Sequence, residues 1–139
     1  MYLVDTNVWL ERLLNQDRSD EVGEFLKQVS ASELSVTDFT FHSVCVVLTR
    51  LGRSDVLLDF VQDVFVESAV NLVSIRPEQT HVVVDEIKKY KLDFDDAYQY
   101  VAAEENGLTL ISFDTDFDRT GKGKKTPTEI LQETSASDG

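Results

Sequence analysis

The sequence lacks several features that would define a protein class at once. Its 139 residues include one Cys, two Pro and six Gly. A single cysteine excludes an internal disulfide and a multi-cysteine metal site, and Cys45 lies in an apolar run that indicates a buried side chain. Few prolines and glycines indicate closely spaced elements with short connections. No apolar run approaches the roughly 20 residues that a membrane span needs, so we expect a cytoplasmic protein without membrane association.

Positive charge is also scarce, since 13 Lys and Arg stand against 26 Asp and Glu and the formal net charge is −13. This charge argues against surface-wide attraction to nucleic acid, because the phosphate backbone is itself a dense line of negative charge. The charge is still compatible with an enzyme that binds phosphate groups through divalent cations, which its own carboxylates would hold. An acidic surface is also typical of salt-adapted proteins, and composition does not separate the two explanations.

The chain does contain a regular alternation of short apolar runs and amphipathic segments. The apolar runs 1–4, 34–36, 71–75 and 108–113 predict strands. Apolar residues at spacings of three and four predict helices at 8–14, 20–29, 37–51, 54–66, 77–89 and 93–106. With no two-residue hairpin signal, this order predicts one α/β domain over residues 1–131, a three-layer α/β/α sandwich with a mostly parallel central sheet. Residues 132–139 are small and polar and are predicted to form a disordered tail.

Acidic residues follow two of the predicted strands. Asp5 comes directly after the first strand, and Asp114 and Asp116 follow the last one. Ligands of an open parallel sheet collect outside the carboxyl ends of its strands, and Asp95 and Asp96 begin the helix that leads into the last strand. Carboxylates packed together repel one another, so such a cluster persists best around a divalent cation. Oxygen ligands without His or Cys at ligand spacing favour Mg²⁺ or Mn²⁺ over Zn²⁺.

Each of these acids also has a purely structural interpretation. An Asp after a strand is often a helix cap or a turn residue. Acids in a first helical turn are favoured by the helix dipole, which applies to Asp93, Asp95 and Asp96. Because the positions fall at one predicted edge of the sheet, the sequence favours the metal site.

Three segments resemble the motifs of PIN domains, particularly those of the VapC-like toxins of toxin–antitoxin pairs. They are 4–7 (VDTN), 95–98 (DDAY) and 110–117 (LISFDTDF), and the resemblance runs in order from residue 2 to about 131. It implies an α/β/α sandwich and a Mg²⁺- or Mn²⁺-dependent endoribonuclease that hydrolyses RNA phosphodiester bonds with a quartet of acidic residues. It also implies a homodimer and a cognate antitoxin as protein partner.

The resemblance assigns roles to individual residues of this chain. Asp5, Asp96 and Asp114 match three catalytic, metal-binding acids of the quartet, and Asp116 matches an additional ligand often found two residues further on. Either Thr6 or Asn7 matches the small polar residue that supports the first carboxylate. Ser112 matches the hydroxyl residue that precedes the last acid of the quartet.

The second acid of the quartet is missing. The family usually has a Glu early in the third helix, about six residues after a Ser at the end of the second strand. Counting from Thr37 leads to Ser43 and counting from Ser35 leads to Phe41, neither of which is acidic. The nearest polar substitutes are Asp38 and His42. Two functions are therefore considered. One is a ribonuclease with a single, weakly bound metal, in which Ser43 has a supporting role. The other is a catalytically degenerate PIN-like domain that binds an antitoxin or a second copy without cutting RNA.

Two further features concern partners. The densest basic run directly follows the last acidic motif and consists of Arg119, Lys122, Lys124 and Lys125. Such a loop either contacts RNA phosphates or is merely an exposed loop kept soluble by its charges. Segments 56–66 and 82–87 are more apolar than one helix face requires, so we expect one of these helices to be buried against another subunit.

Overall fold

The computed structural model describes residues 1–138, and the side chains of residues 1–135. One parallel sheet has the strand order β3-β2-β1-β4, with strands β1 (Tyr2–Val4), β2 (Leu34–Thr37), β3 (Asn71–Val73) and β4 (Thr109–Ile111). In the register of the sheet, Leu3 lies opposite Ser35 on one side and Leu110 on the other. The predicted parallel α/β fold is confirmed, and each strand falls within a segment predicted to be one or extends it by a residue.

Helices connect the strands in the expected alternation. The first crossover consists of α1 (Thr6–Leu13), α2 (Ser19–Gln28) and the 3₁₀ turn η1 (Ala31–Glu33). The second consists of α3 (Asp38–Arg50), α4 (Ser54–Val61) and the π-helical turn η2 (Gln62–Val66), and the third of the 3₁₀ turn η3 (Pro77–Gln79), α5 (Thr80–Tyr90) and α6 (Phe94–Glu105). After β4 the chain forms the 3₁₀ helix η4 (Thr115–Arg119) and the helix α7 (Pro127–Asp138).

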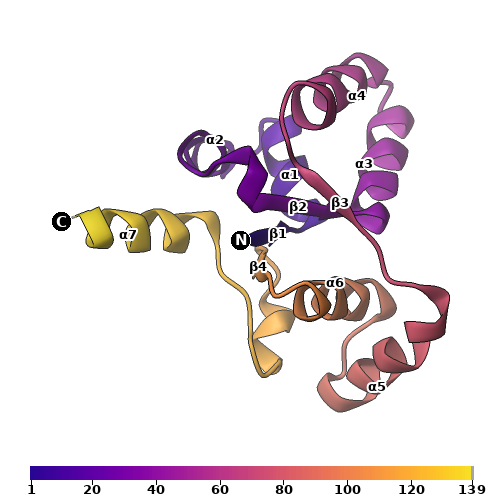
Figure 1. Ribbon diagram of the computed structural model, residues 1–139. Coiled ribbons are helices and arrows are strands. Elements are labelled where there is room, and N and C mark those ends of the chain that lie inside the picture. Colours follow the sequence, from indigo (N-terminus) through magenta and orange to yellow (C-terminus); the bar gives the residue numbers. More distant parts are fainter. Residues whose placement is uncertain (139) are drawn as a thin grey trace.

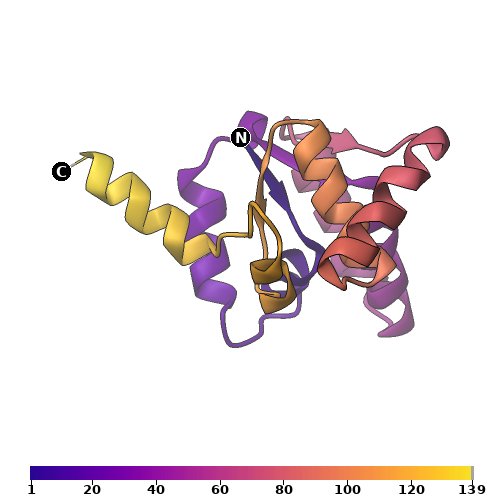
Figure 2. The ribbon, with the colours of Figure 1, turned by 90° about the horizontal axis from the view of Figure 1, so that it is seen from below.

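The helices lie on both faces of the sheet. Helices α1 to α4 lie on one face, and α5 and α6 lie on the other (Figures 1 and 2). Strand side chains alternate between the two cores, since Val4 and Ile111 pack with α1 to α4, whereas Leu3 and Leu110 pack with α6. This alternation follows from the period of two along a strand and produces the predicted three-layer sandwich.

The order of the strands defines the edge of the sheet at which a ligand would bind. The chain moves from β1 to β2 and β3 on one side and then returns to the other side of β1 with β4. The carboxyl ends of β1 and β4 therefore flank the point where the strand order reverses, which is where open α/β sheets bind ligands. Asp5 directly follows β1, and Ser112 directly follows β4.

Helix α7 includes residues 132–138, which the sequence predicted to be a disordered tail, and Gly139 lies outside the described residues. Its start has Pro in the first turn and a reciprocal pair in which Thr126 N–H donates to Glu129 and Glu129 N–H donates to Thr126 Oγ1. Ile130 is 2% exposed and packs in the core beside α2, and Thr128 N–H donates to Glu21 of α2. Contact with a helix that is distant in sequence stabilises α7, and local composition does not reveal such a contact. In the described part of the chain, no helix combines the length and apolar character needed to cross a membrane.

Candidate functional site

Asp5 is the deepest acidic residue at this edge of the sheet. Its side chain is buried, with 6% of the residue exposed, and it caps α1 by accepting a hydrogen bond from Thr6 N–H at 2.8 Å. Gln99 Nε2 donates to Asp5 Oδ1 at 2.9 Å, and Ser112 Oγ donates to Asp5 Oδ2 at 2.8 Å. Burial raises the pKa of Asp5, the hydrogen bonds oppose this shift, and the Asp114 carboxylate adds to it. Asp5 is thus both a helix cap and a fixed carboxylate of the site.

Gln99 is the centre of a hydrogen-bond network that joins four elements. It is 1% exposed on α6, donates to Thr40 Oγ1 at 2.8 Å, and accepts from Thr37 Oγ1 at 2.6 Å. Thr37 ends β2 and caps α3 through Thr40 N–H, and the hydroxyls of Thr40 and Thr6 are 2.9 Å apart. The position of Asp5 therefore depends on β1, β2, α3 and α6 together.

The sequence interpretation assigned no functional role to Gln99 or Thr40. One signal was present, because Gln99 follows Asp96 by three residues and so lies on the same side of α6. A long polar residue among the alanines and aromatics of a buried helix face requires hydrogen-bond partners. Which partners it has was decided by the packing of α6 against the sheet.

Three further carboxylates lie together near Asp5. One oxygen from each of Asp96, Asp114 and Asp116 lies within 4.8 Å of the others. Asp96 stands in the first turn of α6, and Asp114 caps η4 by accepting from Asp116 N–H at 2.8 Å. The structure thus brings together the acidic residues that the sequence placed at one edge.

Asp96 is the acid of the cluster whose pKa is most clearly perturbed. The pKa of Asp96 is raised from 3.8 to about 7 by burial, by the carboxylates of Asp114, Asp93 and Asp5, and by a hydrogen bond shared with Asp114. Asp93 itself is the cap of α6 and accepts from Asp96 N–H at 2.9 Å, so its role is structural. At neutral pH a bound cation would relieve the repulsion among the remaining acids.

Polar side chains hold the two strand ends of the site together. Ser112 is fully buried, and besides donating to Asp5 its Oγ accepts from Asp114 N–H at 3.0 Å and from Asn7 Nδ2 at 3.2 Å. Asn7 Oδ1 accepts from Phe113 N–H at 3.2 Å. Asn7 and Ser112 therefore join α1 to the end of β4, whereas Thr6 contacts Asp5 through its backbone N–H and Thr40 through its hydroxyl.

A cavity of about 280 Å³ opens onto these residues. It is lined by Asp5, Thr6, Asn7, Leu10, Phe39, Ser43, Asp95, Asp96, Gln99 and Asp114. Of the three residues considered for the missing acid, Ser43 lines the cavity, whereas Asp38 accepts from Tyr98 Oη at 2.7 Å and from Phe39 N–H. Helix α3 therefore presents the hydroxyl of Ser43, and not the carboxylate of Asp38, to this cavity.

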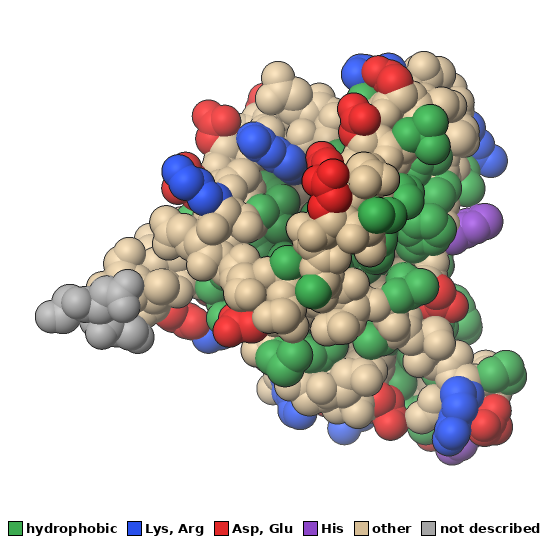
Figure 3. Space-filling view, turned by 45° about the horizontal axis from the view of Figure 1, so that its top comes forward, with side chains coloured by type: hydrophobic (Ala, Val, Ile, Leu, Met, Phe, Trp, Pro, Cys, Tyr) green, Lys and Arg blue, Asp and Glu red, His purple; other side chains and the backbone are tan. Residues whose placement is uncertain are grey.

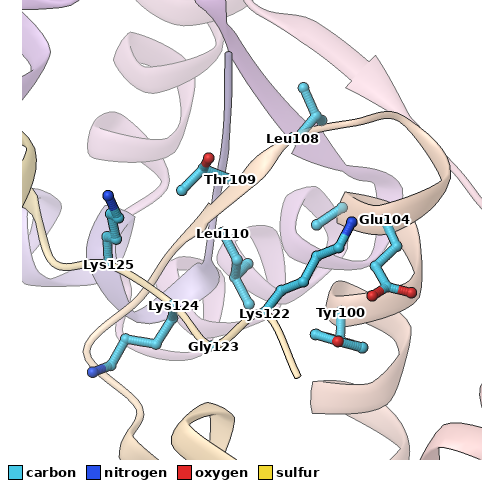
Figure 4. A pocket seen from close by; sticks show the side chains of 10 residues that line it. Tyr100, Glu104, Leu108, Thr109, Leu110, Lys122, Gly123, Lys124 and Lys125 are labelled. Carbon is cyan, nitrogen blue, oxygen red and sulfur yellow. The ribbon is translucent and has the colours of Figure 1, made fainter. Parts of the chain in front are cut away.

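The four basic residues of the sequence motif do not share one location. Arg119 contacts the cluster, because its guanidinium donates to Asp116 Oδ1 at 2.6 Å and to the carbonyl of Lys91 at 2.6 Å. The lysines Lys122, Lys124 and Lys125 instead line a second cavity between the end of α6 and β4 (Figure 4). There Lys122 points toward Glu104, whereas the ends of Lys124 and Lys125 point away from it (Figure 4).

The second cavity does not join the lysines into a basic surface. Lys124 pairs with Asp118 at 3.2 Å, and Lys125 pairs with Glu133 of α7. The backbone of Lys125 forms a bridge with Ile111, so this part of the basic run is held against the sheet. On the face that Figure 3 presents, Lys and Arg side chains are scattered among acidic and apolar ones.

The fold is shared with several solved structures from bacteria. A toxin–antitoxin complex from Klebsiella pneumoniae has a TM-score of 0.73 and 23% identity over 91% of this chain and 98% of that chain. FitAcB from Neisseria gonorrhoeae has a TM-score of 0.72 and 19% identity over 92% and 99%. VapC20 from Mycobacterium tuberculosis, a sarcin-ricin loop cleaving toxin, has a TM-score of 0.74 and 13% identity over 88% and 96%.

A comparison with curated proteins gives no match. The family model of the PIN domain, however, matches residues 2–123, which include both strand ends, the acidic cluster and the hydrogen-bond network beneath it. The chain therefore belongs to the PIN domain family.

Proposed function

We propose that this chain is a metal-dependent endoribonuclease of the VapC toxin type, which hydrolyses RNA phosphodiester bonds at the acidic site. The observation that carries the proposal is the convergence of Asp96, Asp114 and Asp116 within 4.8 Å, next to the buried Asp5. Membership of the PIN domain family and the likeness to a toxin described as cleaving the sarcin-ricin loop support this activity.

The donor set fits Mg²⁺ or Mn²⁺. All of the converging groups are carboxylate oxygens, which hard divalent cations prefer. Asp96, Asp114 and Asp116 would hold the ion, with Asp5 binding directly or through water. Arg119 contacts only Oδ1 of Asp116, so the second oxygen of that carboxylate is available to an ion. Because α3 presents Ser43 and not an acid, we expect one weakly bound ion.

When bound by these carboxylates, a divalent cation would supply an activated water and would neutralise charge on the phosphodiester. The protein positions the carboxylates for this chemistry. Gln99 and Ser112 donate to both oxygens of Asp5, which favours its ionised form and prevents it from rotating. The Arg119 guanidinium, anchored on the Lys91 carbonyl, lies at the edge of the cluster, where its remaining N–H groups would contact a phosphate oxygen.

A cleavage assay tests the proposal. Labelled single-stranded RNA is incubated with the purified protein and Mg²⁺ or Mn²⁺, with chelator as the blank. The variants Asp5→Asn and Asp96→Asn should abolish cleavage, whereas Asp118→Asn, which alters an exposed acid paired with Lys124, should cleave normally. An Asp96→Asn protein that cleaves RNA as well as the wild type would refute the assignment.

Ser43 favours a second candidate, a catalytically degenerate domain that binds protein partners. In this case an antitoxin or a second copy of the chain would be held near the acidic cavity without RNA cleavage. The related structures from Klebsiella pneumoniae and Neisseria gonorrhoeae, the first a toxin–antitoxin complex, support an antitoxin as partner for either function. A Mn²⁺ titration followed by the cleavage assay separates the candidates, and light scattering of the purified protein tests the proposed homodimer.

A further inference from the structure

A row of three aromatic rings leads away from the acidic cavity. Phe39, in the first turn of α3, lines the cavity together with Asp5 and Asp96. The ring of Tyr98 on α6 lies against Phe39 with 6.1 Å between centroids, and the ring of Phe94 lies against Tyr98, again at 6.1 Å. The planes of neighbouring rings are inclined to each other by 50° and 37°. Two helices thus form one continuous aromatic surface, here called the aromatic row.

The aromatic row is not part of the apolar cores. Within the described residues, its three rings stand outside the clusters of buried apolar side chains that fill the two cores. Phe94, the first residue of α6, is 49% exposed. It adjoins the acidic cavity only through Tyr98 and Phe39, and a set of neighbouring aromatic rings that ends at a polar cavity is typical of a binding surface.

The central ring of the row is fixed by hydrogen bonds. The hydroxyl of Tyr98 donates to Asp38 Oδ1 at 2.7 Å and accepts from Ile75 N–H at 3.0 Å. These two hydrogen bonds hold the central ring between its neighbours, so little side-chain freedom remains to be lost when a ligand binds. Asp38, which the sequence offered as a substitute for the missing acid, therefore supports the aromatic row.

We propose that the aromatic row is a stacking site for unpaired bases of single-stranded RNA, and this inference rests on the proposed nuclease function. A strand whose phosphate lies at the acidic cluster must place neighbouring bases close to Phe39, because that ring lines the same cavity. The chain has a net charge of −13, Lys124 and Lys125 are engaged in ion pairs, and Arg119, the residue proposed to contact a phosphate, shares its charge with Asp116. Affinity for RNA must then come largely from contacts that do not need positive charge, and stacking on aromatic rings is such a contact.

RNA binding to variants of Phe94 tests the inference. The probes are fluorescein-labelled oligoadenylate and an oligomer of equal length with abasic positions. Binding is measured by fluorescence anisotropy with Ca²⁺ in place of Mg²⁺ to prevent cleavage, and the RNA is recovered afterwards to show that it is intact. Phe94→Ala should weaken binding of oligoadenylate by about tenfold or more and leave binding of the abasic oligomer unchanged. Leu58→Ala is the matched control, since Leu58 is 69% exposed on α4 and should have no effect.

A second variant reports directly on contact between the row and the bases. The chain has one Trp, the buried Trp9, so Phe94→Trp adds an exposed indole at the row. Its fluorescence should be quenched by oligoadenylate and not by the abasic oligomer. The dependence of binding on salt and the affinity for Mn²⁺ without RNA should be the same in Phe94→Ala as in the wild type, because no charge is altered.

These experiments distinguish a failure of the stacking-site inference from a failure of the proposed nuclease function. If Phe94→Ala binds oligoadenylate as the wild type does while metal-dependent cleavage persists, the stacking site is wrong and the nuclease function stands. If the wild type neither binds nor cleaves RNA, both are wrong. If Phe94→Ala changes self-association in sedimentation experiments and leaves RNA binding intact, the row is a protein interface and the stacking site is again refuted.

Discussion

Replacing Gln99 with Leu removes the centre of the network beneath Asp5 while nearly preserving side-chain volume. Three hydrogen bonds are lost: to Asp5 Oδ1 at 2.9 Å, to Thr40 Oγ1 at 2.8 Å, and from Thr37 Oγ1 at 2.6 Å. All of these groups are buried, so water does not replace the lost partners without opening the structure. The substitution therefore leaves the Thr37 hydroxyl proton without its acceptor and removes one of the donors to Asp5 and to Thr40.

The expected loss of stability is about 3 kcal/mol. A hydrogen bond to a charged group contributes about 1.5–3 kcal/mol, and a neutral one about 0.5–1.5 kcal/mol. Burial of the Leu side chain offsets this loss by about 1–2 kcal/mol. Because a domain of this kind is stable by only about 5–15 kcal/mol, the change is a large fraction of the total.

Urea unfolding in the presence of chelator, followed by circular dichroism, measures the effect. The midpoint should fall while the slope m stays constant, since the same surface is exposed on unfolding. The control is Gln62→Leu, which alters an exposed glutamine at the end of α4 and should change stability by no more than about 0.5 kcal/mol. A loss for Gln99→Leu below about 1 kcal/mol would refute the view that this network holds Asp5.

Three further predictions concern the cluster and α7. The pKa of Asp96 is raised from 3.8 to about 7, so the folded protein holds this proton more tightly than the unfolded chain does. The metal-free stability of the wild type, compared with that of Asp96→Asn, should therefore fall as pH rises across that interval and level off above it. Urea midpoints without this trend would contradict the repulsion described for Asp96. Ser43→Glu should tighten Mn²⁺ binding about tenfold or more in calorimetry, since it adds a carboxylate to the cavity lining, whereas the uncharged Ser43→Gln should not. Ile130→Ala should cost about 2–5 kcal/mol in urea unfolding, because the side chain is 2% exposed in the core beside α2, and a loss near zero would show that α7 does not depend on this contact.

Much of the fold and part of the candidate site follow from local patterns. Short apolar runs predicted the strands because a parallel strand covered on both faces needs apolar side chains in both directions. Asp5 and Asp114 were predicted from their places after strands, since strand ends of a parallel sheet lie at one edge. Helix α7 was missed because its stability comes from Ile130 packing beside α2, over a hundred residues earlier in the chain. Gln99 was missed for the same reason, since its partners come from three other elements.

The sequence by itself determined the family, the parallel α/β architecture and the edge at which the acids lie, because these depend on residue type and spacing along single elements. Only the tertiary structure decided that Ser43, and not Asp38, lines the acidic cavity. Successive residues of a helix point about 100° apart, so the orientation of α3 against the sheet selects which of its side chains faces the site. The same packing placed Arg119 at the cluster and the three lysines at a different cavity, although the four are neighbours in the chain.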